Sequence, residues 1–256
     1  MLTGKTVIVT GSTTGIGKAI AQECIAQGAH VLIHGRDAER GVAVANQMGP
    51  NARFHQDDLA DPAAANRIVN AALEHFGRID CLVNNAARVV RSDIRSTSVD
   101  LFENVMAINV RAPLLLVQAA LDQLQQNQGV VANIGSVNGL GGERNLLAYS
   151  ISKGALLTLS KNLADALGTA RIRFVHFNVG WVLTENEYEY KLADGLSEDW
   201  PTQLPTHEIP AGRMTRPEEI ANVVTFWLSD KSVPFSGTVM ELDQFPFEGR
   251  NPTREE

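Results

Sequence analysis

The sequence predicts a single α/β domain over residues 1–256, built on one doubly wound, mainly parallel sheet with helices on both faces. Strand-like and helix-like segments alternate about every 25 residues, which implies right-handed βαβ crossovers between parallel strands. A glycine-rich turn joins the first strand to the first helix. No stretch rich in proline, glycine and serine divides the chain, so we expect one domain and not two.

The expected strands are short apolar runs. Residues 5–10 are rich in β-branched side chains and are followed by glycine, which is typical of a buried parallel strand. The later strands are expected at residues 29–34, 53–56, 79–83, 129–134, 171–177 and 238–242.

The expected helices begin and end at residues that favour helix ends. Apolar spacing from Ile16 stops at Gly28, and Asp37 is expected to cap the second helix. Asp61-Pro62 opens the third helix with proline at its first position. The helices are expected at residues 16–27, 37–48, 62–76, 104–126, 146–168 and 217–229.

Residues 184–210 break this alternation. They contain Trp200, four residues that are proline or glycine, and many acids. A long irregular insertion in a compact domain is usually a functional loop, so we expect a lid over the substrate.

The amino-acid composition argues against some classes of function for this protein. A hydrophobic fraction of 44% can supply an ordinary core, and the net charge of −7 argues against nucleic acid. Two cysteines make no disulfide framework, so a reducing cytoplasm is the expected location. We expect no membrane association, because no uninterrupted apolar stretch approaches roughly 20 residues and no leader pattern precedes the first strand. No metal ligands are assigned.

The glycine-rich turn predicts a phosphate cradle. In Gly11-x-x-x-Gly15-x-Gly17, glycines permit positive φ and a close approach of the backbone to a pyrophosphate. The helix that follows offers free N–H groups and the positive end of its dipole. The spacing differs from G-x-G-x-x-G, and a simple tight turn is the alternative. The candidate contacts are Gly11, Thr13, Thr14, Gly15, Ile16 and Gly17.

The end of the second strand bears on the choice of dinucleotide. Gly35 stands where a carboxylate would bind a ribose 2′-OH, and Arg36 follows with a guanidinium that suits a 2′-phosphate. This favours NADP over NAD, unless Arg36 simply pairs with Asp37 or Glu39.

Two further turns lie at the carboxyl edge of the sheet, where open α/β folds bind ligands. Asp58-Leu59 could bracket an adenine, although Asp57-Asp58 could equally cap the next helix. The small residues and amides after the fourth strand would let a nucleotide lie close; they are Asn84, Asn85, Ala86 and Ala87.

Tyr149 and Lys153 are four residues apart on an expected helix, so their side chains share a face. An ammonium about 5 Å from a phenolate, at an effective dielectric of about 20, stabilises it by roughly 3 kcal/mol. This would lower the pKa of Tyr149 by about two units and suit it to general acid–base catalysis. A surface tyrosine beside a helix-stabilising lysine is the alternative.

Ser136 and Asn109 extend this pair. Ser136 follows the fifth strand, where its hydroxyl could hold a substrate oxygen beside Tyr149, or could be a turn serine. Asn109 lies inside an apolar helix, where asparagine is unfavourable and needs partners. It could hold a water that relays protons from Lys153, or it could cap a local kink.

Together these residues resemble the short-chain dehydrogenase/reductase family almost end to end. The resemblance rests on Thr10-Gly-Ser-Thr-Thr-Gly-Ile-Gly17, Asn84-Asn-Ala86, Asn109, Ser136, Tyr149-x-x-x-Lys153, Gly180-Trp-Val182-x-Thr184 and Gly212-Arg-Met-x-Arg-Pro217.

That resemblance implies a Rossmann-like fold and a catalytic tetrad of Asn109, Ser136, Tyr149 and Lys153. It further implies that Lys153 bonds the nicotinamide ribose, and that Val182 and Thr184 contact the nicotinamide amide. Members are usually homotetramers or homodimers assembled through the long helices.

The sequence departs from the family pattern in three places. Val179 stands in place of proline, Ala87 replaces a glycine, and Asp243-Gln-Phe245 replaces Asp-Gly-Gly. None of these changes removes a catalytic group.

The sequence therefore predicts an NADP-preferring oxidoreductase that interconverts alcohols and carbonyls. The polar side chains near residues 137–145 and in the expected lid favour a small sugar- or polyol-like substrate, unless they face solvent or another subunit. A 3-oxoacyl carrier-protein reductase, which would need a basic landing patch, and a non-catalytic dinucleotide sensor are the alternatives. The candidate substrate contacts are Ser136, Asn138, Arg144, Tyr149 and Trp181.

Overall fold

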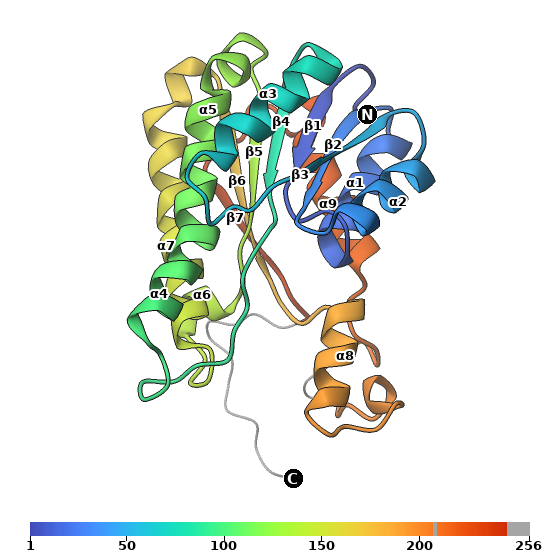
Figure 1. Ribbon diagram of the computed structural model, residues 1–256, viewed down its shortest axis with the longest axis vertical. Coiled ribbons are helices and arrows are strands. Elements are labelled where there is room, and N and C mark those ends of the chain that lie inside the picture. The colour runs from blue at the N-terminus through green and yellow to red at the C-terminus, as the bar shows by residue number, and fades with distance from the viewer. Residues whose placement is uncertain (207–208, 245–256) are drawn as a thin grey trace.

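The computed structural model describes residues 1–206 and 209–244, which form a seven-stranded sheet in the order β3-β2-β1-β4-β5-β6-β7 (Figure 1). Every pair of neighbouring strands is parallel. The predicted doubly wound, Rossmann-like fold is confirmed. The strands are β1 (Thr6–Val9), β2 (His30–Gly35), β3 (Ala52–Gln56), β4 (Cys81–Asn84), β5 (Val130–Ile134), β6 (Arg173–Val179) and β7 (Thr238–Leu242).

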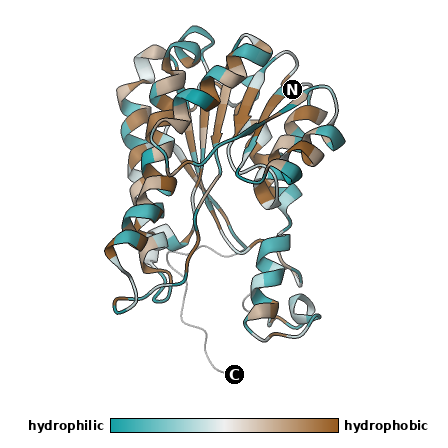
Figure 2. Cartoon of the chain, in the orientation of Figure 1, coloured by the Kyte–Doolittle hydropathy of each residue, from teal (hydrophilic) through white to brown (hydrophobic). Residues whose placement is uncertain are grey.

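Helices cover both faces of the sheet, which explains why the central strands are continuous apolar runs. Every residue of β1, β4, β5 and β6 is buried. One face packs against α1 (Gly15–Ala26), α2 (Ala38–Met48) and α9 (Pro217–Leu228). The other packs against α3 (Ala64–Phe76), α5 (Ala112–Gln126) and α7 (Leu147–Ala166). Figure 2 shows hydrophobic residues gathered on the sheet and on the helix faces turned toward it.

The strand order reverses direction in the middle of the sheet. From β1 the chain moves outward through β2 and β3, and then it returns to the centre at β4 and continues outward to β7. The carboxyl ends of β1 and β4 therefore flank the position where open α/β folds bind ligands.

The long helix that precedes β5 starts earlier than the sequence predicted and is interrupted. It begins as α4 (Val99–Met106), because the Ser98 hydroxyl accepts a hydrogen bond from the N–H of Leu101 and caps it. A π-helical turn, η1 (Ala107–Arg111), then joins α4 to α5. Similarly, α3 begins at Ala64 and not at the predicted proline.

Among the described residues, the combined helix Val99–Gln126 is long and apolar enough, by length and composition alone, to cross a membrane. Its most apolar window has a mean hydropathy of 1.4, and half of that window is buried inside the protein. Leu116 and Leu124 on it are fully buried in the core beneath the sheet. Core helices of globular domains pass the same test.

Residues 181–206 and 209–214, here the α8 segment, are more regular than the sequence predicted. They contain α8 (Glu185–Ala193) and a 3₁₀ turn, η3 (Trp200–Thr202). The Thr184 hydroxyl caps α8 by accepting a hydrogen bond from the N–H of Glu187. The segment has a small core of its own around Trp200, against which Trp181 and Tyr188 stack. Figure 1 shows α8 beyond the carboxyl edge of the sheet. The remaining short elements are α6 (Asn138–Gly141), η2 (Gly168–Ala170) and η4 (Asp230–Ser232).

Candidate active site

The glycine-rich turn has the backbone geometry that the sequence predicted. Gly11 and Gly15 have φ values of 62° and 54°, in the left-handed region that favours glycine. A Cβ at Gly17 would lie 2.3 Å from Nδ2 of Asn85 and 2.4 Å from the carbonyl oxygen of Gly11. Only glycine fits at that position without moving the turn.

The turn is fastened to the neighbouring strands by hydrogen bonds. The Asn85 amide donates to the carbonyl oxygens of Thr10 and Gly11, which brings the turn after β4 beside the glycines. The N–H of Gly11 donates to Nδ1 of His34 at 3.2 Å. Burial lowers the pKa of His34 to about 4, so its ring is neutral at pH 7 and can accept that bond.

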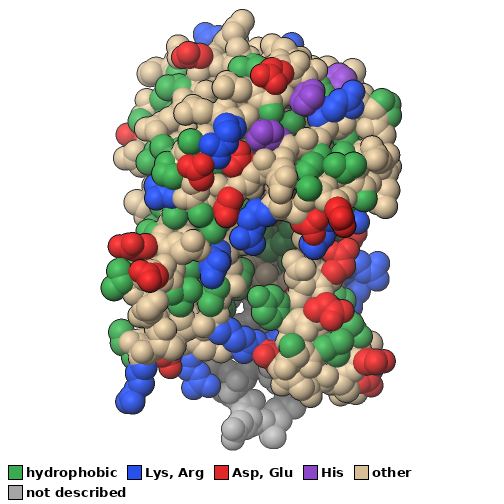
Figure 3. Space-filling model, in the orientation of Figure 1, with side chains coloured by type: hydrophobic (Ala, Val, Ile, Leu, Met, Phe, Trp, Pro, Cys, Tyr) green, Lys and Arg blue, Asp and Glu red, His purple; other side chains and the backbone are tan. Residues whose placement is uncertain are grey.

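The start of α1 has the chemistry of an anion site. Its N-cap residue, Thr14, makes no side-chain capping bond, and its first turn contains no acid. The N–H of Gly15 instead donates to a carboxylate oxygen of Glu185, 3.2 Å away. The turn therefore already binds an anion, and a dinucleotide pyrophosphate fits the same donors. Figure 3 shows this face of the molecule hollowed at its centre, with Lys and Arg side chains bordering the opening.

Arg36 lies beside this turn and is exposed. A Cβ at its neighbour Gly35 would lie 2.7 Å from Cγ2 of Thr13, so the end of β2 contacts the glycine-rich turn. The alternative pairing with Asp37 is not formed, because Asp37 caps α2 and forms its ion pair with Arg40.

The turn after β3 is mainly structural. The Asp58 carboxylate accepts from the N–H of Ala60, and the Asp57 carboxylate forms a two-bond ion pair with Arg67. Leu59 is buried in the core. These contacts order the turn but do not cap the next helix, because α3 begins after Ala63 without a side-chain cap. Asp58 is exposed at the carboxyl edge.

Ser136, Tyr149 and Lys153 come together where β5 ends. The Ser136 hydroxyl lies near enough to the phenol of Tyr149 to influence its pKa. Lys153 is buried, and its ammonium lies 5.6 Å from the centre of the Tyr149 ring. The same ammonium donates to the carbonyl oxygen of Ile134 at 2.6 Å. Tyr149 is half-buried.

The predicted direction of the Tyr149 pKa is wrong. Burial raises that pKa above its ordinary value, and the hydrogen bond with Ser136 only opposes the rise. The attraction of the ammonium alone would lower this pKa, but the free energy of burying a phenolate acts in the opposite direction. Burial also lowers the pKa of Lys153 to about 8, so this side chain is still mostly cationic at pH 7.

Asn109 joins the helix that precedes β5 to the helix that carries the tyrosine. Its Oδ1 accepts from the N–H of Arg88 at 2.7 Å, and its Nδ2 donates to the Arg88 carbonyl oxygen. Nδ2 also donates to Oγ of Ser152 at 2.9 Å, and that hydroxyl donates to the carbonyl oxygen of Tyr149. Asn109 lies within the π turn, which favours the alternative of a local irregularity in the helix.

The candidate substrate residues are not all gathered at this point. Asn138 is held next to Ser136 by a hydrogen bond from its own N–H to the Ser136 hydroxyl. Arg144 is exposed. Trp181 belongs to the α8 segment, where it stacks on Trp200 and donates to the Glu187 carboxylate.

Of the two residues expected at the nicotinamide amide, Thr184 lies close to the glycine-rich turn. Val182 is buried and forms a β-bridge with Thr215. Thr184 approaches Gly15, because a Cβ built there would lie 3.3 Å from Cγ2 of Thr184.

The departures from the family pattern are accommodated. Val179 ends β6 and pairs in register with Leu242 of β7. Ala87 is exposed. Asp243 packs on Gly180, where a Cβ would lie 2.2 Å from its carboxylate, and the Gln244 side chain bonds the backbone at residues 211 and 213. Phe245 lies outside the described residues.

Three contacts at this site were missed from the sequence. They involve Arg88, Ser152 and Glu185, whose partners are 21, 43 and 170 residues away along the chain. One signal was present, because Thr184-x-x-Glu187 is the pattern of a helix start. It locates α8 but not the residue that α8 contacts.

Comparison with known proteins agrees with this geometry. The sequence profile of the family described as short chain dehydrogenase matches residues 5–194. This chain belongs to that family. A Thermotoga maritima protein described as an uncharacterized oxidoreductase is 35% identical over 244 residues, which cover 94% of this chain and 96% of the relative.

Other short-chain dehydrogenases differ in what their names say they act on. The L-rhamnose 1-dehydrogenase (NAD(P)(+)) of a Sphingomonas species is 31% identical and covers 95% of this chain and 96% of its own. The crystal structure of 3-ketoacyl-(acyl-carrier-protein) reductase from Brucella melitensis, complexed with NADH, is 27% identical. It superposes with a TM-score of 0.84 and covers 95% of this chain and 98% of its own.

As a short-chain dehydrogenase, the protein is an oxidoreductase that acts on alcohol or carbonyl groups. The glycine-rich turn and the Ser136–Tyr149–Lys153 group lie at the carboxyl edge of the same sheet, which is where this fold places its chemistry.

Proposed function

We propose that the protein interconverts an alcohol and a carbonyl on a small, polar, sugar- or polyol-like substrate, with NADP as its preferred cofactor. The observation that carries this proposal is the group at the end of β5, where the hydroxyls of Ser136 and Tyr149 interact beside the buried ammonium of Lys153. Two hydroxyls that converge on one point can hold and protonate one substrate oxygen.

A bound nicotinamide dinucleotide supplies or accepts the hydride. In the reducing direction, Tyr149 gives its proton to the substrate oxygen while the Ser136 hydroxyl holds that oxygen by a hydrogen bond. The raised pKa of Tyr149 keeps the phenol protonated at neutral pH, which suits this role as an acid. In the oxidising direction the same phenolate takes the proton back.

Lys153 acts on Tyr149 through charge. As the proton leaves the phenol, negative charge develops beside a cation that is already fixed by its hydrogen bond to Ile134. A fixed charge in a buried place stabilises such a change more than one in water. Asn109 holds the backbone at Tyr149 through Ser152, so it supports the position of the group and does not itself bear the reacting proton.

The preference for NADP is supported by Arg36. Its side chain is exposed at the end of β2, and within residues 1–206 and 209–244 it forms no ion pair, since the nearby Asp37 is used by Arg40. A free guanidinium suits a 2′-phosphate, and the position lacks the carboxylate that would bind a ribose 2′-OH.

The substrate class is supported by polar groups near Ser136, namely Asn138 and the exposed Arg144 of the following loop. A relative named as an L-rhamnose dehydrogenase agrees with a polyhydroxylated substrate. The second candidate is a 3-oxoacyl carrier-protein reductase, which the name of the solved relative favours. A substrate panel of aldoses, polyols and an acetoacetyl thioester separates the two.

We further propose that the protein works in the cytoplasm as a homotetramer or homodimer. The exposed apolar side chains of Val99 and Ile151, on the helices α4 and α7, support a contact between subunits. Sedimentation velocity measures the state directly.

Tyr149→Phe tests the catalytic role, because it keeps the ring and removes the proton. We expect kcat to fall by about 10²- to 10⁴-fold, the usual contribution of a general acid, with the Kd for NADPH unchanged. Tyr190→Phe is the matched control, since Tyr190 is exposed on α8. Unchanged turnover in Tyr149→Phe contradicts the mechanism. Tight NADPH binding with no turnover by the unmodified protein, across the whole panel, would indicate a sensor.

A further inference from the structure

The contact between Glu185 and the glycine-rich turn joins two segments that are far apart along the chain. The carboxylate Oε2 of Glu185 accepts the N–H of Gly15 at 3.2 Å, and the adjacent Asn186 amide reaches Oγ1 of Thr14 at 3.5 Å. Thr184 also lies against Gly15. The first turn of α8 therefore sits directly on the first turn of α1.

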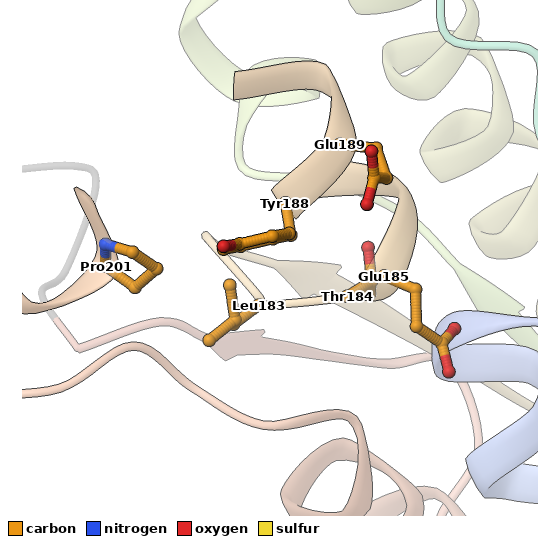
Figure 4. Close-up of a pocket in the computed structure, with 6 residues that line it drawn as sticks. All are labelled: Leu183, Thr184, Glu185, Tyr188, Glu189 and Pro201. Atoms are coloured by element: carbon orange, nitrogen blue, oxygen red, sulfur yellow. The ribbon is translucent and has the colours of Figure 1, made fainter. Parts of the chain in front are cut away.

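Glu185 is turned away from its neighbouring acid. Figure 4 shows its carboxylate pointing toward the N-terminal part of the chain, whereas Glu189 lies one turn further along α8. Both border a hollow of about 370 Å³ that is also lined by Leu183, Thr184, Tyr188 and Pro201. All of these lining residues belong to the α8 segment.

The two ends of α8 are held in different ways. Its first turn is joined to α1 through Glu185 and Asn186, which are both exposed. Its last turn is followed by Asp194, which forms an ion pair with Arg91 after β4. The first turn can therefore leave the cradle while the other end of α8 stays attached.

A carboxylate at this place has a chemical consequence. The N–H of Gly15 is one of the donors that a pyrophosphate would use, and a carboxylate and a pyrophosphate are both anions. Two anions that need the same donor repel each other at contact distance, so one must leave before the other binds.

We propose that Glu185 is a built-in competitor for the pyrophosphate of the dinucleotide. This inference rests on the proposed function. Binding of the dinucleotide displaces the Glu185 carboxylate from Gly15 and moves the first turn of α8 off the cradle. The apparent affinity for the dinucleotide is then weaker than the cradle alone would give, by the free energy of breaking this contact. Glu185 thus sets cofactor affinity and links it to the position of α8.

The test measures Kd by calorimetry for NADPH and for 2′-phospho-ADP-ribose, which has the pyrophosphate but no nicotinamide. Glu185→Gln removes the charge, and Glu185→Ala removes the contact as well. We expect both variants to lower Kd for both ligands by about three- to tenfold, the size of one ordinary hydrogen bond at an exposed position. Glu189→Gln is the matched control, because it removes the same charge one turn away, and we expect it to leave Kd unchanged.

Three outcomes overturn the inference. Kd could stay the same or rise in Glu185→Gln and Glu185→Ala. Glu189→Gln could lower Kd equally, which would make the effect one of overall charge on α8. The change could also appear with NADPH alone, which would place it at the nicotinamide and not at the pyrophosphate. Failure of the unmodified protein to bind either ligand would instead overturn the proposed function, so the two failures are distinguishable.

Discussion

Arg36 is the residue that should distinguish the two dinucleotides. Its guanidinium is exposed, and Asp37 does not pair with it, because Asp37 forms an ion pair with Arg40. Arg36→Ala should raise Kd for NADPH by about ten- to a hundredfold and leave Kd for NADH unchanged, because only NADPH carries the 2′-phosphate. Fluorescence titration with each cofactor measures both values.

Arg40→Ala is the control for that experiment. Arg40 is also exposed but is paired with Asp37, so we expect its loss to change neither Kd beyond the small effect of a surface charge. Equal losses for NADPH and NADH in Arg36→Ala would contradict the assignment of Arg36 to the phosphate.

At the scale of single residues, the sequence showed which side chains meet but not their surroundings. The spacing of Tyr149 and Lys153 and the position of Ser136 after a strand were sufficient to bring those three together. The direction of the Tyr149 pKa was not predictable, because it depends on how deeply the fold buries the phenol.

At the scale of elements, the contact between the π turn and α7 is the connection that holds the tyrosine helix in place. Ser152→Ala should lower the free energy of unfolding by about 1 to 3 kcal/mol, because it leaves the buried Nδ2 of Asn109 with one bond fewer. Urea denaturation measures this change.

Thr158→Val is its matched control. Thr158 is on the same helix, and its hydroxyl bonds only the carbonyl oxygen of Gly154 at an exposed position. We expect a change within about 0.5 kcal/mol. A double-mutant cycle of Ser152→Ala with Asn109→Ala should give a coupling energy of about 0.5 to 3 kcal/mol, and additive effects would mean that the two side chains do not interact.

Element boundaries were predictable where a capping residue was recognised. Asp37 caps α2 as predicted. Ser98 and Thr184 cap α4 and α8 in the same way. The sequence placed the start of the first of these helices too far along the chain and did not predict the second. The π turn had only one local sign, an asparagine in an apolar helix, since its cause lies in contacts with Arg88 and Ser152 from other parts of the chain.

At the scale of the whole molecule, two buried histidines should make stability depend on pH. Burial lowers the pKa of His34 and of His176 to about 4, against an ordinary value of 6.5. The folded state therefore binds fewer protons than the unfolded state between these values, and stability is lost as pH falls through this window. We expect the free energy of unfolding to fall by up to about 1.4 kcal/mol per pH unit for each histidine.

Urea unfolding at several pH values between about 6.5 and 4 measures that slope. His34→Asn should roughly halve it, since an asparagine oxygen can still accept from the N–H of Gly11. His75→Asn, at an exposed position, should leave the slope as it is. The carboxylate of Asp57 does not interfere, because hydrogen bonds from Arg67 lower its pKa to about 2. A slope unchanged by His34→Asn would contradict this account.

The fold as a whole was the most predictable level. Alternating strands and helices, with a glycine-rich turn after β1, were sufficient to give the parallel sheet and the edge that carries the site. The contact of Glu185 with Gly15 was not predictable, because no local pattern states which distant segment a helix will touch.

The tripeptide Ile134-Gly135-Ser136 should tolerate almost no substitution. The Ile134 side chain is buried in the core, and Ser136 interacts with the phenol of Tyr149. A side chain at Gly135 would place its first carbon 2.1 Å from the imidazole of His176. Protein engineers who wish to broaden the range of accepted substrates should therefore leave these three positions alone and diversify the exposed residues 143–145.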